Sequence, residues 1–119
     1  MEFFLSDPDV VRFLPKDTRL VDLQAEPYPD GKRIRVVLDL TPFQQKPYID
    51  LNLKDSAGII AATTSIVEPV TNRLELTLHI RRPPTDTTAQ FTLSATLYYP
   101  DLGEVDHRLL DLVLPSPTQ

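Results

Sequence analysis

The sequence predicts a single antiparallel β-sandwich of seven strands, and three observations support this. From Leu20 onward hydrophobic residues recur with a period of two, which is typical of strands that bury one face. Three short segments place Asp early and Gly late, as tight turns between strands require. The chain also holds 12 prolines in 119 residues, and proline fits strand edges and loops better than helix interiors. We therefore expect an all-β domain.

The clearest strand is predicted over residues 73–81. Four apolar residues alternate there with polar ones, whereas a helix would distribute them around its whole circumference. Further segments with the same alternation begin at residues 34, 49 and 89. The side chains expected to point inward and form the core are Ile34, Val36, Leu38, Leu40, Ile49, Leu51, Leu53, Leu74, Leu76, Leu78, Ile80, Ala89, Phe91, Leu93, Ala95, Leu97 and Tyr99.

The tight turns predict three hairpins and leave one strand without a hairpin partner. The expected hairpins pair 20–28 with 32–40, 48–54 with 59–67, and 90–99 with 104–114. The other connections contain proline and lack a two-residue turn, as expected where a chain crosses between sheets. This order predicts a Greek-key topology, in which the first, second and fifth strands form one sheet and the remaining strands form the other.

One segment resembles a known family. The run Asp86-Thr87-Thr88-Ala89-Gln90-Phe91-Thr92-Leu93 is similar to the Asp, Ala, Tyr, Cys segment that enters the sixth strand of immunoglobulin-like and fibronectin type III modules. Phe91 stands at the position of the corner tyrosine and Leu93 at that of the cysteine, and the chain has no tryptophan. With the strand order, the resemblance covers residues 18–114 and implies an immunoglobulin-like architecture. It implies no functional residue, and it leaves the corner hydroxyl bond and the disulfide missing.

Residues 1–17 depart from the strand pattern and predict a short helical or irregular N-terminal segment. Ser6, Asp7 and Pro8 precede an apolar run and are suited to the start of a helical turn, which Pro15 should end. The segment is too apolar to remain solvated, so we expect it to pack on one open end of the sandwich or on a partner. Residues 18–114 should form the sandwich, and residues 115–119 a tail.

Charge and composition exclude several classes of partner. The formal net charge of −5 opposes binding to nucleic acid or to an anionic membrane surface. The absence of cysteine suits a reducing compartment, and we expect a cytoplasmic protein. The N-terminus lacks the basic region of a secretion signal, and no apolar run approaches the roughly 20 residues that span a bilayer.

Catalytic chemistry has little support in the sequence. The two histidines, His79 and His107, are predicted to point outward from different sheets, about 10 Å or more apart. No serine lies in a Gly-x-Ser-x-Gly context of the kind that presents a nucleophile. We therefore expect neither an enzyme nor a cofactor.

Carboxylates gather around the last hairpin, where clustered oxygen ligands could hold calcium. However, Asp101 already suits the turn, and no spaced Asp-x-Asp-x-Asp loop is present. Asp106 and Asp111 are expected to alternate along the last strand as solubilising residues. We expect no calcium site among Asp101, Glu104, Asp106 and Asp111.

The best functional candidate is a surface on the sheet that contains the third, sixth and seventh strands. The residues predicted to form this candidate interaction face are Tyr48, Asp50, Asn52, Thr96, Tyr98, His107, Leu109 and Val113. Tyrosines and aliphatic residues among small polar ones favour protein interfaces, although scattered exposed apolar residues are also normal. We predict a non-catalytic interaction module that binds another protein or its own copy as a homodimer. The alternatives are a carbohydrate or small-ligand site at Tyr48, Asp50, Asn52 and Tyr98, or a subunit of an enzyme with an unrecognised site.

Overall fold

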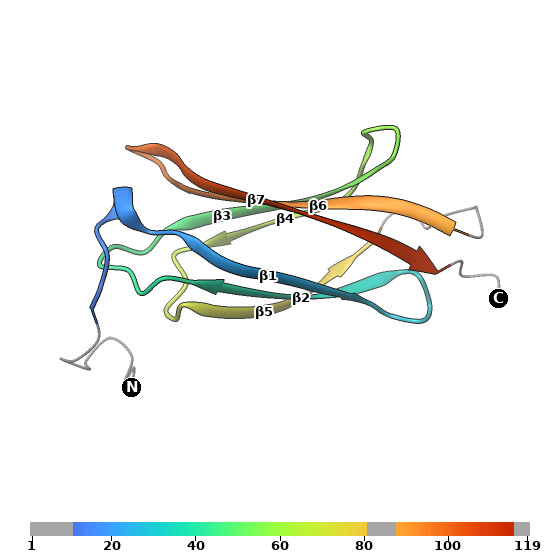
Figure 1. The fold of residues 1–119 in the computed structure, drawn as a ribbon, viewed down its shortest axis with the longest axis horizontal. Helices are drawn as coiled ribbons and strands as arrows, with labels where there is room; N and C mark the ends of the chain where they lie inside the picture. The colour runs from blue at the N-terminus through green and yellow to red at the C-terminus, as the bar shows by residue number, and fades with distance from the viewer. Residues whose placement is uncertain (1–10, 81–87, 116–119) are drawn as a thin grey trace.

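The computed structural model describes residues 11–80 and 88–115 and confirms the predicted all-β sandwich. Strands β1, β2 and β5 form one sheet in that order, and β4, β3, β6 and β7 form the second in that order. Figure 1 shows the two sheets as facing layers. The elements are a 3-10 turn at Pro15–Asp17 (η1) and the strands β1 (Leu20–Pro27), β2 (Arg33–Leu40), β3 (Tyr48–Asp55), β4 (Ile60–Val67), β5 (Arg73–His79), β6 (Thr88–Tyr99) and β7 (Gly103–Pro115).

The three predicted hairpins are confirmed, and the fifth strand has no hairpin partner, as expected. β1 pairs with β2, β3 with β4, and β6 with β7, all antiparallel, while β5 pairs with β2 after crossing from the other sheet. The hairpin glycine Gly58 has a φ of 84°, a conformation that a side chain disfavours. The carboxylate of Asp55 accepts the backbone N–H groups of Ala57 and Ile59 in the same turn. These local signals therefore determine the hairpin positions.

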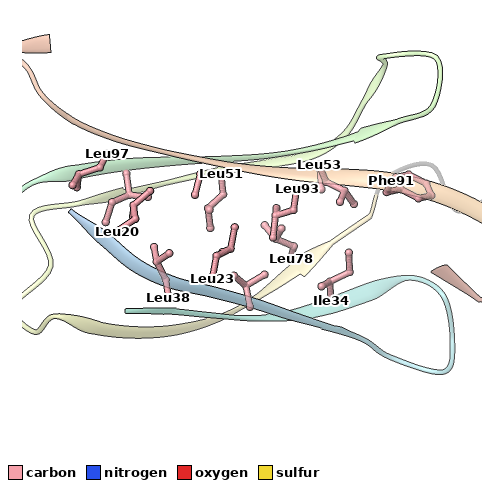
Figure 2. Close-up of a cluster of buried hydrophobic side chains, with 14 of the residues drawn as sticks. Leu20, Leu23, Ile34, Leu38, Leu51, Leu53, Leu78, Phe91, Leu93 and Leu97 are labelled. Atoms are coloured by element: carbon pink, nitrogen blue, oxygen red, sulfur yellow. The ribbon is translucent and has the colours of Figure 1, made fainter. Parts of the chain in front are cut away.

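The hydrophobic core lies between the two sheets and uses the predicted inward-facing residues, apart from Ala89, whose side chain lies outside the described part of the chain. Leu38 from the three-stranded sheet and Leu51 and Leu93 from the four-stranded sheet are fully buried. Figure 2 shows these labelled side chains projecting from opposite layers into the shared interior. Because every second residue of each strand is directed inward, the intervening residues face outward from the two sheets.

Two local features depart from strict alternation. Val37 lies on the outward side of β2 and is nevertheless only 5% exposed, because its register neighbours Gln24 and Glu75 flank it with long side chains. In β4 the register shifts opposite Leu53 and Lys54, so Ala61 is the extra residue of a β-bulge. The bulge confines the regular part of β4 to residues 62–67.

The N-terminal segment differs from the expected helical turn where it is described. Pro15 begins the 3-10 turn instead of ending a helical turn, in agreement with the preference of proline for a first helical position. Phe13 forms a parallel bridge to Phe43, with its N–H donating to the carbonyl of Pro42 at 2.9 Å. The expectations for residues 1–10, 81–87 and 116–119, including the Asp86-Thr87 part of the family resemblance, lie outside the described residues.

The edges of β1 and β7 are joined by side chains, which corrects the expectation that Asp106 only solubilises its strand. The backbone N–H of Leu20 donates to Asp106 Oδ2 at 2.8 Å. Arg108 Nε donates to the carbonyl of the same leucine at 3.2 Å. The backbone N–H and C=O of Leu20 are thus both bound by side chains of β7, which connects the two sheets along this side of the sandwich.

No helix among the described residues is long and apolar enough to cross a membrane.

Candidate interaction face

The outward side of the four-stranded sheet, here called the outer face, brings most of the predicted site residues together. Strand register aligns them in rows across β4, β3, β6 and β7. The rows are Val67, Tyr48, Tyr98 and Glu104; then Ser65, Asp50, Thr96 and His107; then Thr63, Asn52, Ser94 and Leu109. Val113 lies further along β7, opposite Gln90. Seven of the eight predicted residues therefore occupy three adjacent rows.

Two half-buried tyrosines form one end of the outer face. The ring centroids of Tyr48 and Tyr98 lie 5.5 Å apart, with the rings tilted by 37°. The Tyr98 hydroxyl donates to Asp50 Oδ1 at 3.5 Å. Burial, followed by the negative charge of Asp50, raises the pKa of Tyr98 above its ordinary value. The tyrosine therefore stays protonated at neutral pH and presents a neutral aromatic surface.

The polar side chains of the outer face are hydrogen-bonded to one another across strands. Ser65 Oγ donates to Asp50 Oδ1 at 2.8 Å. Thr63 Oγ1 donates to Asn52 Oδ1 at 2.6 Å. Each of these bonds links β4 to β3, so the acceptor side chains are held in position before any partner binds. Side chains fixed in this way lose less conformational entropy when a partner docks.

Apolar side chains complete the outer face on its β7 side. Leu109 is 64% exposed and Val113 is 53% exposed. The exposed imidazole of His107 lies in the row beside Leu109. The strand therefore combines exposed aliphatic surface with one imidazole ring.

The opposite side of the molecule, formed outward from β1, β2 and β5, has a different character. Arg35 Nε lies 2.6 Å from Glu75 Oε2, and Arg73 lies 2.9 Å from Asp39 Oδ1. The hydrogen bond from Arg35 lowers the pKa of Glu75 and raises that of the arginine itself. Charges dominate this side, whereas hydroxyl, amide and aromatic groups dominate the outer face.

The two histidines lie on different sheets. His79 belongs to β5 and His107 to β7. Across residues 11–80 and 88–115, no group of three or more His, Cys, Asp or Glu side chains is placed to hold a metal ion. Asp111 accepts a hydrogen bond from Thr92 Oγ1 at 3.0 Å on the surface. The absence of catalysis and of calcium remains a prediction.

The sequence interpretation omitted the contribution of β4 to the outer face. Thr63, Ser65 and Val67 point outward beside the predicted residues. The signal was present, because the hairpin turn at residues 55–58 determines which residues of β4 lie opposite Tyr48, Asp50 and Asn52. A shallow hollow of about 300 Å³ also lies where β6 meets β7, lined in part by Gln90, Thr92 and Val113.

Comparisons with known proteins show likeness of fold. No protein-family model matches the chain, and no curated protein matches it. The chain is similar to a glycosyl hydrolase family 2 member from Bacteroides cellulosilyticus, with a TM-score of 0.62, 11% identity, 82% of this chain covered and 15% of the other. It is also similar to a Bifidobacterium dentium β-glucuronidase, with a TM-score of 0.59, 11% identity and coverages of 82% and 18%. A Bacteroides vulgatus β-glycosidase gives a TM-score of 0.56, 15% identity and coverages of 80% and 13%.

The chain spans less than one fifth of each of these solved enzymes. The shared part is therefore one β-sandwich within a much longer chain. At these identities the comparison establishes the arrangement of strands, and the activity of those enzymes is not transferred to this chain.

Proposed function

We propose that this chain is a non-catalytic interaction domain that docks the outer face of its four-stranded sheet onto another protein. The observation that carries the proposal is the contrast between the two sides of the sandwich. The side formed by β1, β2 and β5 is covered by ion pairs, which suits contact with water. The three rows of the outer face hold two charged residues, Asp50 and Glu104, together with a tyrosine pair, and β7 adds two exposed aliphatic residues.

This contrast matches the composition of protein interfaces. Charged residues are depleted at interface centres, whereas tyrosine is enriched there because it adds a large contact area with few rotatable bonds. The Tyr48 and Tyr98 rings supply such an anchor. Asp50, the carboxylate nearest to them, already accepts hydrogen bonds from two hydroxyls, which reduces the cost of covering it.

The non-catalytic character is part of the same proposal. His79 and His107 belong to strands of different sheets, which argues against the two imidazoles acting together in one site. In the similar solved enzymes this fold is a minor part of the chain, which favours a non-catalytic role for such a sandwich. We also propose a cytoplasmic location, supported by the absence of cysteine.

Carbohydrate binding, alone or as a subunit of an enzyme, is the second candidate. It is favoured by the likeness to a β-glucuronidase and a β-glycosidase. On the outer face Tyr48 and Tyr98 would supply aromatic surface and Asn52 an amide. The 37° tilt between the rings is less suited to a flat sugar platform than to an irregular protein surface, and it therefore favours the first candidate.

A double substitution on the outer face tests the proposal. Tyr48→Ala with Tyr98→Ala removes both rings, while Arg35→Ala with Glu75→Ala removes an ion pair from the opposite side as a matched control. Both proteins and the unchanged chain are used for quantitative affinity capture and for binding to a glycan array. We expect captured partners to fall at least about tenfold with the tyrosine variant and to persist with the control.

Partners that persist in the tyrosine variant would contradict the proposal. Glycan binding that the tyrosine variant abolishes, with no captured protein, would favour the second candidate. Circular dichroism of each variant ensures that a folded protein is compared in every case.

A further inference from the structure

Strand β4 (Ile60–Val67) forms an edge of the four-stranded sheet that carries no charge. Its sequence, Ile-Ala-Ala-Thr-Thr-Ser-Ile-Val, contains no charged residue, proline or glycine. Within the described residues β3 is its one neighbour in the sheet. An uncharged edge strand rich in β-branched residues is a template for pairing with another strand, and proteins usually protect such edges.

The other edge strands of the sandwich carry this protection. β1 contains Asp22, Glu26 and Pro27, and the backbone of Leu20 is bound by side chains from β7. β5 contains arginine, glutamate and histidine, and β7 contains five charged or histidine residues and ends at a proline. Charges and prolines oppose edge-to-edge pairing. β4 is therefore the edge of this sandwich at which such pairing meets least resistance.

The backbone of β4 is oriented for pairing over residues 63–67. The N–H of Glu68 donates to the carbonyl of Pro47 and is therefore directed toward β3. The direction of the backbone N–H and C=O groups alternates from residue to residue along a strand. The N–H and C=O groups of Ile66 and Thr64 therefore also point toward β3, and those of their neighbours point away from it. The residues whose N–H and C=O groups point to the open edge are Thr63, Ser65 and Val67.

A groove beside this edge has room for the side chains of an added strand. It has a volume of about 260 Å³ and lies between Thr63 and Thr64 of β4 and the β5 segment at residues 77–80. Ile66 of β4 and Leu76 of β5 pack against the core and remain half-exposed. The inward-facing side chains of a strand added to β4 would point into this region.

We propose that β4 pairs antiparallel with β4 of a second copy of this chain, about a two-fold axis at Ser65. This register uses all three open backbone positions of the regular part of the strand. It places Ser65 opposite Ser65, Thr63 opposite Val67, and Thr64 opposite Ile66. Such an isologous contact is the commonest way in which identical chains associate.

The symmetric placement of the open positions selects the second copy as the occupant. Thr63 and Val67 lie evenly on either side of Ser65, so an identical strand satisfies all three positions in one register. The net charge of −5 opposes self-association at long range, but no pair in this register brings like charges opposite one another. Within β3 and β4, the carboxylates closest to the axis are the two copies of Asp50, one strand in from each edge. Three strand spacings separate them by about 14 Å, which exceeds the screening length of about 8 Å at physiological ionic strength.

A single engineered thiol tests the register, because the chain contains no cysteine. In the proposed pair the Cα atoms of the two Ser65 residues lie about 5.5 Å apart, within the range that a disulfide spans. We expect Ser65→Cys to form a disulfide-linked dimer under mild oxidation. Thr96→Cys is the matched control, since Thr96 lies on the same outer face but on β6, two strands from the edge.

Failure of Ser65→Cys to cross-link, or equal cross-linking of Thr96→Cys, would overturn the edge-to-edge arrangement. The second outcome would instead indicate contact through the outer face. The two cysteine positions therefore distinguish this inference from the proposed function.

Sedimentation equilibrium provides the second measurement. We expect the unchanged chain to form dimers at about 100 μM, and Ser65→Lys to weaken association at least tenfold, because it places two ammonium groups opposite each other. The Tyr48→Ala, Tyr98→Ala variant should dimerise as the unchanged chain does. A chain that remains monomeric at about 1 mM, or a folded Ser65→Lys variant that dimerises equally well, refutes the proposal.

Discussion

Replacement of Tyr99 by phenylalanine should destabilise the fold, although it removes one oxygen atom from the chain. The side chain is fully buried at the end of β6. Its hydroxyl donates to the carbonyl of Gln45 at 2.8 Å and lies 3.3 Å from Thr18 Oγ1. It thus connects β6 to the crossing between β2 and β3 and to the segment before β1.

The size of the expected loss of unfolding free energy follows from the hydrogen bond between the Tyr99 hydroxyl and the Gln45 carbonyl. A typical intramolecular hydrogen bond contributes about 0.5–1.5 kcal/mol, and leaving a buried acceptor without a donor adds to the loss. The Thr18 hydroxyl keeps an acceptor in the carbonyl of Leu14 at 3.0 Å, so the loss falls mainly on Gln45. We expect Tyr99→Phe to reduce the free energy of unfolding by about 1–2 kcal/mol and the Tm by about 4–8 °C.

The adjacent tyrosine supplies the control. Tyr98 is on the same strand but faces outward, and its hydroxyl reaches Asp50 at 3.5 Å, the limit of a hydrogen bond. Tyr98→Phe should change the free energy of unfolding by less than about 0.5 kcal/mol. Urea denaturation of the three proteins measures both values. Equal losses, or a larger loss in Tyr98→Phe, would refute the account of Tyr99 as the residue that fastens this end of the sandwich.

Two further predictions concern titration and sheet closure. Burial raises the pKa of Tyr99 in the folded state, so the unfolded phenol, with a pKa near 10, loses its proton first, and stability should decline as the pH rises above about 10. Urea midpoints between about pH 9 and 11 should therefore fall less steeply in Tyr99→Phe than in the unchanged chain, and identical slopes would contradict this. Asp106→Ala removes the acceptor of the Leu20 N–H and should cost about 1–2 kcal/mol, whereas Asp111→Ala, at an exposed site, should cost less than about 0.5 kcal/mol. Equal losses in urea denaturation would show that Asp106 does not help to join the sheets.

Strand order and the inward-facing residues were predictable because both depend on short-range patterns. A period of two determines which side chains are buried once a strand forms, and Asp with Gly determines where the chain reverses. Gly31, Gly58 and Gly103 all have positive φ, as the turn signals required. Once three hairpins are located, the strand between two crossings has few remaining positions, and β5 joins β2.

The features that the sequence did not reveal depend on contacts between distant residues. Asp106 is opposite the inward-facing Leu97 and Asp111 opposite the outward-facing Thr92, and the carboxylate of Asp106 reaches Leu20, which is 86 residues away in the chain. The corner hydroxyl bond was expected to be missing because Phe91 replaces tyrosine. Tyr99, at the other end of β6, provides a hydroxyl-to-backbone bond of its own. Periodicity assigns a side to each residue but not its partner on that side.

The proposals for the outer face and for the β4 edge concern one sheet and affect each other. Pairing of β4 with its copy would extend the four-stranded sheet across the two-fold axis and place two outer faces side by side. Each copy would then present its Tyr48 and Tyr98 pair on the same surface. A partner with two matching sites would bind such a dimer far more tightly than a monomer, since the second contact forms at high effective concentration. Ser65→Lys should therefore weaken capture of a two-site partner more than it weakens capture of a partner with a single site.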